Sequence, residues 1–172
     1  FEEQLQELQE YAPSRPVRDA LAVVEPLWQD YRALALGPAS RASAAQMLER
    51  NNALLKSCHQ VVLELQAFAG RDSAQMVNIA GRQRMLSQRL AKAWIMTGMG
   101  IASERAGTIL TESRSRFEAQ LAELKNFVPN DDVREALVRI EREWGIYKAT
   151  LAAAPRPDTA QRVYESSETV QN

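Results

Sequence analysis

The sequence has few of the residues that build covalent and metal sites. Its 172 residues include one cysteine, Cys58, and one histidine, His59. A single cysteine excludes a framework of intrachain disulfides. A single histidine argues against a zinc site and against a di-iron carboxylate site, because helical bundles build the latter with a Glu-x-x-His motif from each of two helices. We therefore expect neither a metal nor a cofactor.

Long apolar runs and a large net charge are also lacking. No run of about 18 apolar residues occurs, so we expect no membrane span within these residues. The formal net charge is −1 and the pI is near 6.0, which gives no reason to expect nucleic acid or an anionic membrane surface as a partner. The sequence shows no nucleophile–base pair, metal cluster or phosphate-binding loop, so we expect no enzyme.

The sequence does contain apolar residues at steps of three and four along nearly its whole length, which predicts an all-α fold, an antiparallel helical bundle. The stripes are Val17, Leu21, Val24, Trp28 and Tyr31; Leu48, Leu55, Val62, Leu65 and Phe68; and Met85, Leu86, Leu90 and Ile95. No segment alternates with period two between hairpin turns, so we expect no sheet. The predicted helices cover 1–12, 16–35, 41–69, 73–97, 104–127, 131–152 and 158–172. Gly70 should end one helix and Asp72 or Ser73 should cap the next.

The chain also resembles itself. The 34 residues from Phe1, FEEQLQELQEYAPSRPVRDALAVVEPLWQDYRAL, align without gaps on the 34 from Phe117, FEAQLAELKNFVPNDDVREALVRIEREWGIYKAT, and 15 positions are identical. The matched positions lie 116 apart and include Phe1/Phe117, Pro13/Pro129, Trp28/Trp144 and Tyr31/Tyr147. Two amphipathic helix pairs can look alike without common origin, but the joint coincidence of Phe, Pro, Trp and Tyr favours an internal duplication. We expect both Trp and both Tyr residues to be core anchors.

The repeat predicts the domain organisation. Residues 1–70 would be the last three helices of a first repeat unit, and residues 71–172 a second unit that begins with an additional helix. The counterpart of that helix would lie upstream of Phe1. Because the chain begins with Phe1 rather than Met, we expect a processed product or an excised domain, with any signal peptide or anchor outside the sequence. The helix predicted at 41–69 is about twice as long as its partner that starts at 158, so the register of the repeat predicts that both ends are shortened.

Positive charge is concentrated in one segment, AGRQRMLSQRLAKAW at residues 80–94. The wider span 73–103 holds four cations, Arg82, Arg84, Arg89 and Lys92, and no Asp or Glu. The remaining residues therefore carry −5 (−1 minus +4). A guanidinium matches the paired oxygens of a planar oxyanion, and a buried cation is costly unless it is paired. A small anion from outside is the leading candidate for the missing charge.

Helical spacing distributes these residues over two stripes. One face carries Gly81, Met85, Gln88 and Lys92, and an adjacent stripe carries Arg82 and Arg89. A glycine costs about 1 kcal/mol relative to alanine within a helix, so Gly81 is favourable where a backbone or a ligand must come close. The alternative is a solvated basic face whose cations lie in water or pair with acids such as Glu64 or Glu118. Ser87 has no His or Asp partner and is expected to be a surface hydroxyl.

The run NIAGRQRMLSQRLAKAW resembles the signature helix of the PilJ/NarX-type sensor domain. That family is found outside the membrane in type IV pilus-type methyl-accepting chemoreceptors and in nitrate/nitrite sensor kinases. A glycine-containing break follows, and the family's downstream pattern is then met by Phe117, Leu121, Leu124, Val133, Leu137, Trp144 and Tyr147. The resemblance covers about 73–172 and, through the repeat, most of 1–69.

The resemblance implies a four-helix bundle that works as a dimer and, in nitrate-sensing members, binds one anion between paired signature helices. Arg89 corresponds to the anion-contacting arginine, Arg84 to the other arginine of the motif and Gly81 to its glycine. Arg82 and Gln83 are typical of the chemoreceptor branch. The duplication departs from kinase-type sensors, which carry one unit per chain. The dimer would therefore be a homodimer or, if both units carry a signature helix, an intrachain pseudo-dimer.

These observations predict a periplasmic, extracytoplasmic sensor domain that recognises a small oxyanion, nitrate or nitrite, and signals by helix displacement. The expected ligand-binding residues are Arg89, Gly81, Arg84, Arg82, Gln88 and Met85. The alternative is a helical interaction module that binds a pilus component or another receptor chain and takes no small ligand.

Overall fold

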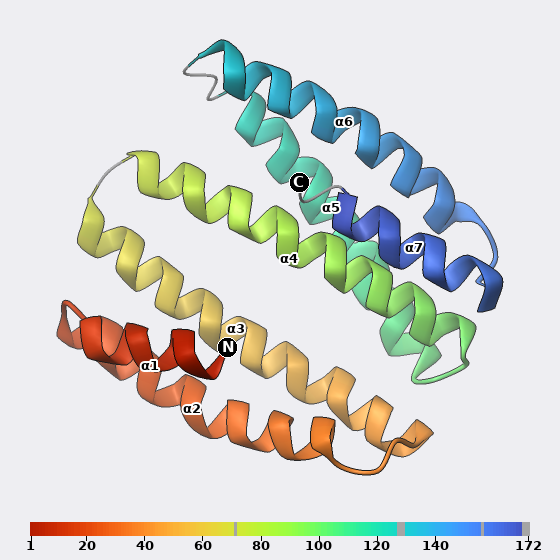
Figure 1. Ribbon diagram of the computed structural model, residues 1–172, viewed down its shortest axis with the longest axis horizontal. Helices are drawn as coiled ribbons and strands as arrows, with labels where there is room; N and C mark the ends of the chain where they lie inside the picture. Colours follow the sequence, from red (N-terminus) through yellow and green to blue (C-terminus); the bar gives the residue numbers. More distant parts are fainter. Residues whose placement is uncertain (71, 127–129, 156, 170–172) are drawn as a thin grey trace. The chain divides into compact units, whose positions relative to one another are not determined.

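The computed structural model describes residues 1–70, 72–126, 130–155 and 157–169, without the side chains of 72, 73, 157 and 158 (Figure 1). Within these ranges the chain is helical, with no strand. The helices are α1 (Glu2–Tyr11), α2 (Arg15–Leu36), α3 (Arg41–Ala69), α4 (Asp72–Gly98), α5 (Ser103–Lys125), α6 (Asp131–Ala152) and α7 (Pro157–Thr169). The all-α fold class is confirmed.

Local capping explains why the helices begin and end where the sequence predicts. The Ser14 side chain accepts a hydrogen bond from the backbone N–H of Val17 at the start of α2, and Asn130 accepts one from Val133 at the start of α6. Gly70 ends α3 in the left-handed conformation at φ 59°, which glycine adopts without a steric penalty. The predicted cap at Asp72 or Ser73 lies outside the described side chains.

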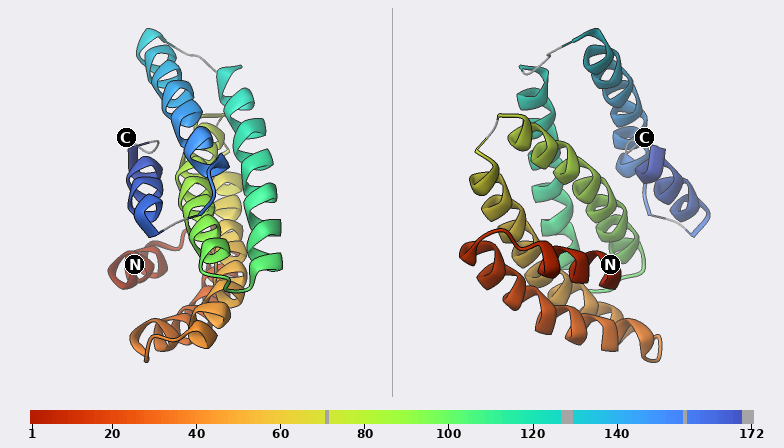
Figure 2. Two further views of the ribbon diagram at one scale, coloured as in Figure 1. Left: turned by 90° about the vertical axis from the view of Figure 1, so that its right-hand side faces the viewer. Right: turned by 60° about the vertical axis from the view of Figure 1, so that its left-hand side comes forward.

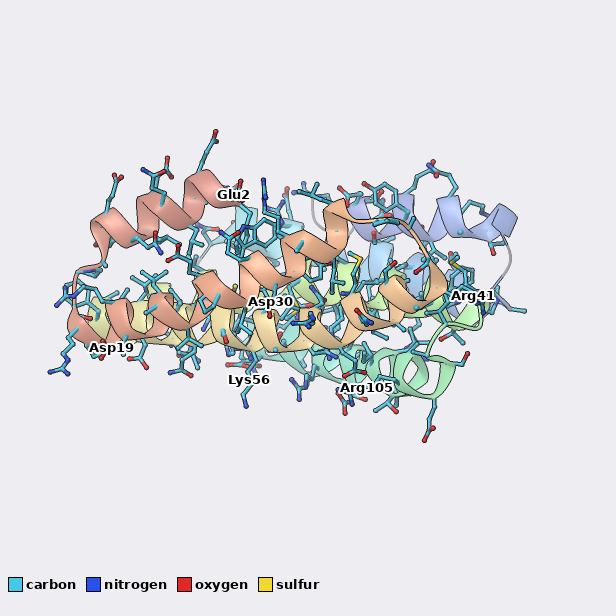
Figure 3. The ribbon with its side chains drawn as sticks, turned by 90° about the horizontal axis from the view of Figure 1, so that it is seen from below. Glu2, Asp19, Asp30, Arg41, Lys56 and Arg105 are labelled. Carbon is cyan, nitrogen blue, oxygen red and sulfur yellow. The ribbon has the colours of Figure 1, made fainter. Side chains whose placement is uncertain are left out.

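The chain divides into two compact units, Phe1–Asn78 and Ile79–Asn172, and the boundary falls inside α4. In the first unit, α2 and α3 run side by side in opposite directions, and α1 folds back on α2 (Figure 1). Figure 3 shows Glu2 at the start of α1, where its carboxylate lies 2.8 Å from the Nε atom of Arg32 on α2. The core of this unit contains Leu5, Ala12, Val17, Leu21, Val24, Leu54 and Val61.

The predicted apolar stripe of α3 is partly wrong. Leu48 is buried as expected, but Leu54 and Val61 fill the core in place of Leu55 and Val62. Phe68, the last residue of the predicted stripe, is exposed. The sequence has two apolar residues in succession at both places, so a heptad spacing fits either choice. Contact with α2 selects the stripe that lies one residue, or about 100° of helical rotation, away.

The second unit is built around α4. Its buried residues include Leu86, Leu90, Trp94, Phe117, Trp144, Tyr147 and Val163. Figure 2 shows α5 and α6 as an antiparallel pair, with the shorter α7 running back beside α6. The indole N–H of Trp94 lies 3.1 Å from the carbonyl oxygen of Leu151 and 3.3 Å from that of Ala153, which ties the last turns of α4 to the end of α6.

The aromatic anchors differ between the two units. Trp144 and Tyr147 are 6% and 0% exposed, as expected of core anchors. Trp28 and Tyr31 are only half-buried, so the expectation that they are core anchors holds in part. None of the helices, within the residues that the structure describes, is long and apolar enough to cross a membrane.

Candidate functional site

The basic segment forms the middle of α4 and has two different sides. One side is buried in the second unit and carries Gln83, Leu86, Ser87, Leu90 and Trp94. The opposite side carries Gly81, Arg84 and Gln88, which are exposed. The helical periodicity therefore separates a packed face from a face that the second unit leaves open.

Polar contacts fix the packed face of α4. The Nε2 amide of Gln83 donates to the carbonyl oxygen of Phe117 on α5 over 3.1 Å. The Tyr147 hydroxyl of α6 donates to the carbonyl oxygen of Ser87 over 2.8 Å, and burial raises the pKa of this tyrosine. The Ser87 Oγ atom lies 2.9 Å from the carbonyl oxygen of Arg84 and 3.2 Å from that of Ser167 on α7. The prediction that Ser87 is a surface hydroxyl is therefore wrong.

Arg82 and Arg89 lie at the edge of this face, where α4 meets α5. Both side chains are half-buried, and desolvation lowers the pKa of each guanidinium. The charge of Arg116 on α5 lowers both pKa values further, and Arg105 adds to the effect at Arg89. Glu123 opposes the shift at Arg82, and Glu112 opposes it at Arg89. The structure thus brings the two arginines of the predicted stripe to one cationic edge.

Lys92 extends the cationic edge toward the end of α4. Its ammonium is largely buried, and desolvation together with the charge of Arg89 lowers its pKa from 10.5 to about 8. The shift has the sign expected when a cation is removed from water beside another cation. An anion bound near Arg89 would favour the charged form of Lys92 and so oppose the lowering of its pKa.

The acids proposed in the alternative interpretation have other partners. The Glu118 carboxylate lies 2.9 Å from the Nζ of Lys148 and 3.6 Å from the Nε of Arg114. Its pKa is lowered chiefly by the hydrogen bond from Lys148. Glu64 accepts a hydrogen bond from the Nε2 of Gln60, one turn away on α3. The carboxylates whose charges act on the α4 arginines are instead Glu112 and Glu123 of α5.

The remaining predicted residues lie on the open face. A Cβ atom built on Gly81 meets no other atom within 4 Å, so a partner has room to approach the backbone there. Met85 is half-buried beside it. The Nε2 amide of Gln88 donates to the carboxylate of Glu168 on α7. The Arg84 side chain is exposed. The predicted residues therefore occupy two adjoining regions, the cationic edge and the open face.

Sequence reasoning did not assign Arg105 or Arg116 to the site. Both belong to α5, and Figure 3 labels Arg105. Their positions, 11 residues or three helical turns apart, place them on one side of α5, and this spacing was the available signal. The sequence predicts Lys92 on the same helix face as Gly81, but the expected ligand-binding residues do not include it. Its burial distinguishes it from an ordinary solvated lysine.

Several cations act on one another at this site. Arg116 acts on Arg82 and Arg89, Arg105 acts on Arg89, and Arg89 acts on Lys92, while Glu112 and Glu123 oppose the shifts at the two α4 arginines. Partly buried charges of one sign repel and are poorly screened by salt. Such an arrangement can bind an anion, because guanidinium groups donate paired hydrogen bonds to planar oxyanions. Nothing in it resembles a nucleophile held by a general base.

Comparison with known proteins identifies the family of the chain. The model of the PilJ family, described as the type IV pili methyl-accepting chemotaxis transducer N-terminal domain, matches residues 68–169, more than half of the chain. No curated protein and no solved structure matches. The matched range contains the whole of α4 and its packing partners α5, α6 and α7. A chemotaxis transducer domain of this kind has a sensory role and is not catalytic. The chain therefore belongs to the PilJ family of type IV pili methyl-accepting chemotaxis transducer N-terminal domains.

Proposed function

We propose that the domain senses a small oxyanion, with nitrate as the first candidate, at the cationic edge and open face of α4. In this proposal the domain lies in the periplasm, and two α4 helices, from two copies of the chain, face each other across the anion. Arg89 contacts the anion, and Arg82 and Lys92 add positive charge beside it. Gly81 lets the two helix backbones approach.

The observation that carries this proposal is the partial burial of several cations beside one another. Desolvation disfavours the charged forms of Arg82, Arg89 and Lys92, as their lowered pKa values indicate, and repulsion from a neighbouring cation adds to it: from Arg116 at Arg82 and Arg89, and from Arg89 at Lys92. An oxyanion would relieve that repulsion while accepting charge-assisted hydrogen bonds. Nitrate fits a guanidinium because both groups are planar and three-fold branched.

The same physics suggests how binding could become a signal. Without the anion, two α4 faces that each carry Arg89 repel. With the anion between them, repulsion becomes attraction, and one relative placement of the helices is favoured over another. A shift of about 1–2 Å between helices at a subunit interface is one of the known forms of allosteric switching. The packed face of α4, held by Gln83, Ser87 and Trp94, would transmit this displacement to α5, α6 and α7.

Calorimetric titration tests the proposal. Nitrate, nitrite and chloride are titrated into the full chain at fixed ionic strength, with Arg89→Ala as the test variant. Arg139→Ala is a matched control, because Arg139 is an exposed arginine of α6 in the same unit. A charge-assisted hydrogen bond contributes about 1.5–3 kcal/mol, so Arg89→Ala should weaken nitrate binding about tenfold to a hundredfold and Arg139→Ala should leave it unchanged. Equal nitrate binding by parent and folded Arg89→Ala would refute the role of Arg89.

The alternative is a helical interaction module, and one observation favours it. Val138 and Ile146 lie on one face of α6 and are 60% and 54% exposed. Contiguous exposed apolar patches mark protein-binding surfaces, and in this alternative Val138 and Ile146 would belong to one. If the parent binds no oxyanion at millimolar concentration, this interpretation replaces the sensor of a small anion.

A further inference from the structure

Two helical hairpins of this chain make the same polar contacts at positions 116 apart. In the first, the carboxylate of Glu2 on α1 lies 2.8 Å from the Nε of Arg32 on α2. In the second, the carboxylate of Glu118 on α5 lies 2.9 Å from the Nζ of Lys148 on α6. Gln9 likewise donates to Glu25, as Lys125 does to Glu141.

The ring contacts and helix ends follow the same offset. The rings of Phe1 and Trp28 are 4.4 Å apart, and those of Phe117 and Trp144 are 4.1 Å apart. The ring centroids of Trp28 and Tyr31 lie 6.2 Å apart, and those of Trp144 and Tyr147 lie 6.0 Å apart. Helix α2 (Arg15–Leu36) corresponds residue for residue to α6 (Asp131–Ala152), and α3 and α7 begin at Arg41 and Pro157. These correspondences support a common origin of the two hairpins.

The hairpins differ in what covers them. Phe117 and Leu124 are 0% and 6% exposed, whereas their counterparts Phe1 and Leu8 are 50% and 36% exposed. Trp28 and Tyr31 are half-buried and so are also more exposed than their counterparts Trp144 and Tyr147, which are buried. Four matched positions are therefore core in one hairpin and solvent-accessible in the other.

Helix α4 accounts for this difference. It covers the second hairpin and contacts it through three polar groups: Gln83 to the carbonyl of Phe117, the carbonyl of Ser87 to the Tyr147 hydroxyl, and Trp94 to the carbonyls of Leu151 and Ala153. The counterparts of these hairpin positions in the first unit are Phe1, Tyr31, Ala35 and Gly37. The first hairpin thus has the groups that an α4-type helix uses, in the same register.

We propose that α1, α2 and α3 form a docking surface for a separate helix of the α4 type. The occupant has an amide at the position of Gln83, a small residue at that of Ser87, Leu at that of Leu90 and Trp at that of Trp94. Its backbone carbonyl accepts the hydrogen bond of the Tyr31 hydroxyl, and its apolar side covers Phe1, Leu8 and Trp28. This inference does not depend on oxyanion binding by the α4 cations.

A peptide of residues 79–98 serves as the probe helix, titrated into the full chain labelled with 5-fluorotryptophan. The chain has three tryptophans, and Trp28→Phe assigns the resonance of Trp28. We expect a saturable ¹⁹F shift of the Trp28 signal with those of Trp94 and Trp144 unchanged. A control peptide with Leu90→Glu should give no shift, because the substitution places a charge in the packed face. Tyr31→Phe in the chain should weaken peptide binding, about threefold or more, since one hydrogen bond is lost.

A fusion protein tests the same surface without relying on the folding of a free peptide. A second copy of residues 72–116 is joined directly to Phe1 of the full chain, which reproduces the spacing of 116 residues. We expect the Trp28 signal to move toward that of Trp144 in this fusion and not in one with Leu90→Glu in the added copy. Unchanged Trp28 signals in both the peptide and the fusion experiments would overturn the proposal. Concentration-dependent dimerisation of the parent chain with a Trp28 shift would overturn it too, because the occupant would then be a second copy.

Discussion

The first hairpin, α1 with α2, and the second, α5 with α6, make corresponding contacts at matched positions but in different environments. In the second, α4 covers the aromatic row Phe117, Trp144 and Tyr147, and these residues become core. In the first, Trp28 and Tyr31 make the same ring contacts and remain half-buried. The contacts within a hairpin therefore do not complete a core by themselves. Helix α4 has a structural role in the second unit as well as a candidate role in binding.

The largest expected effect comes from removing the two aromatic anchors in turn. Trp144→Ala leaves a cavity under α4 and should cost about 3–5 kcal/mol of unfolding free energy. Trp28→Ala should cost less than about 2 kcal/mol, because part of that side chain already contacts water. Urea unfolding followed by circular dichroism measures both, fitted with as many transitions as the parent requires. Equal losses would mean that Trp28 is as buried in solution as Trp144.

Nitrate should stabilise the two units unequally. A ligand at a hundred times its dissociation constant adds about 2.7 kcal/mol to the stability of the state that binds it. Because the cationic residues of the candidate site lie on α4 and α5, the gain should appear in the second unit. Thermal unfolding of the 5-fluorotryptophan chain separates them, since Trp28 reports on the first unit and Trp144 on the second. Sodium sulfate or chloride at equal ionic strength controls for general salt effects, and an equal gain in both units would contradict the assignment.

Lys92 should make the stability of the protein depend on pH. Its folded pKa is about 8, against 10.5 for an ordinary lysine, owing to burial and to Arg89. Between pH 8 and 10.5 the unfolded chain holds a proton that the folded chain has released, so this group makes stability rise with pH. The charges that act on Arg89 from α5 are those of Arg105, Glu112 and Arg116.

Lys92→Met should therefore raise stability at pH 7, by on the order of 1–2 kcal/mol, and flatten the rise between pH 8 and 10. Unfolding free energies at pH 7, 8, 9 and 10 measure the effect, with Lys56→Met as an exposed control. In the parent, nitrate affinity should fall as pH rises through 8, because the site loses one positive charge. A parent and a Lys92→Met variant with the same pH profile would show that Lys92 is solvated.

The smallest effect concerns the matched surface contact of the hairpins. Lys125→Gln would convert the Lys125–Glu141 ion pair into the equivalent of the Gln9–Glu25 hydrogen bond. Exposed ion pairs contribute at most about 1 kcal/mol, so the variant should lose less than this. Urea unfolding at low and high salt measures it. A larger, salt-dependent loss would show that this pair contributes more to the second hairpin than the comparison allows.

Much of the fold could be predicted from the sequence, because its helix boundaries have local causes. Ser14, Ser40 and Asn130 cap helices through their own side chains, and Gly70 ends one by its own backbone freedom. The face that a helix buries is decided by its neighbours instead. For that reason the buried stripe of α3 contains Leu54 and Val61, each one residue before the predicted position, because two apolar residues follow one another at both places.

The candidate site was predictable only along α4. The spacing of Arg82 and Arg89 placed them on one stripe, and the structure puts both at the edge facing α5. Arg105 and Arg116 add positive charge to the site, and Ser87 is buried, only because particular helices pack against α4. The sequence of α4 does not show which helices these are. That residues 1–34 and 117–150 superpose as equivalent helical hairpins stays a prediction, and the matched contacts support it.

The central claim is that two α4 faces meet across a bound anion, and cross-linking at Gly81 tests it most directly. In a Cys58→Ser background, Gly81→Cys places a thiol where a built Cβ meets no other atom within 4 Å. We predict that nitrate changes the rate of interchain disulfide formation at this position, and that adding Arg89→Ala abolishes the change. Val138→Cys on the exposed face of α6 should show no nitrate effect. A rate at Gly81→Cys that is independent of nitrate, or an equal change at both positions, would contradict the account.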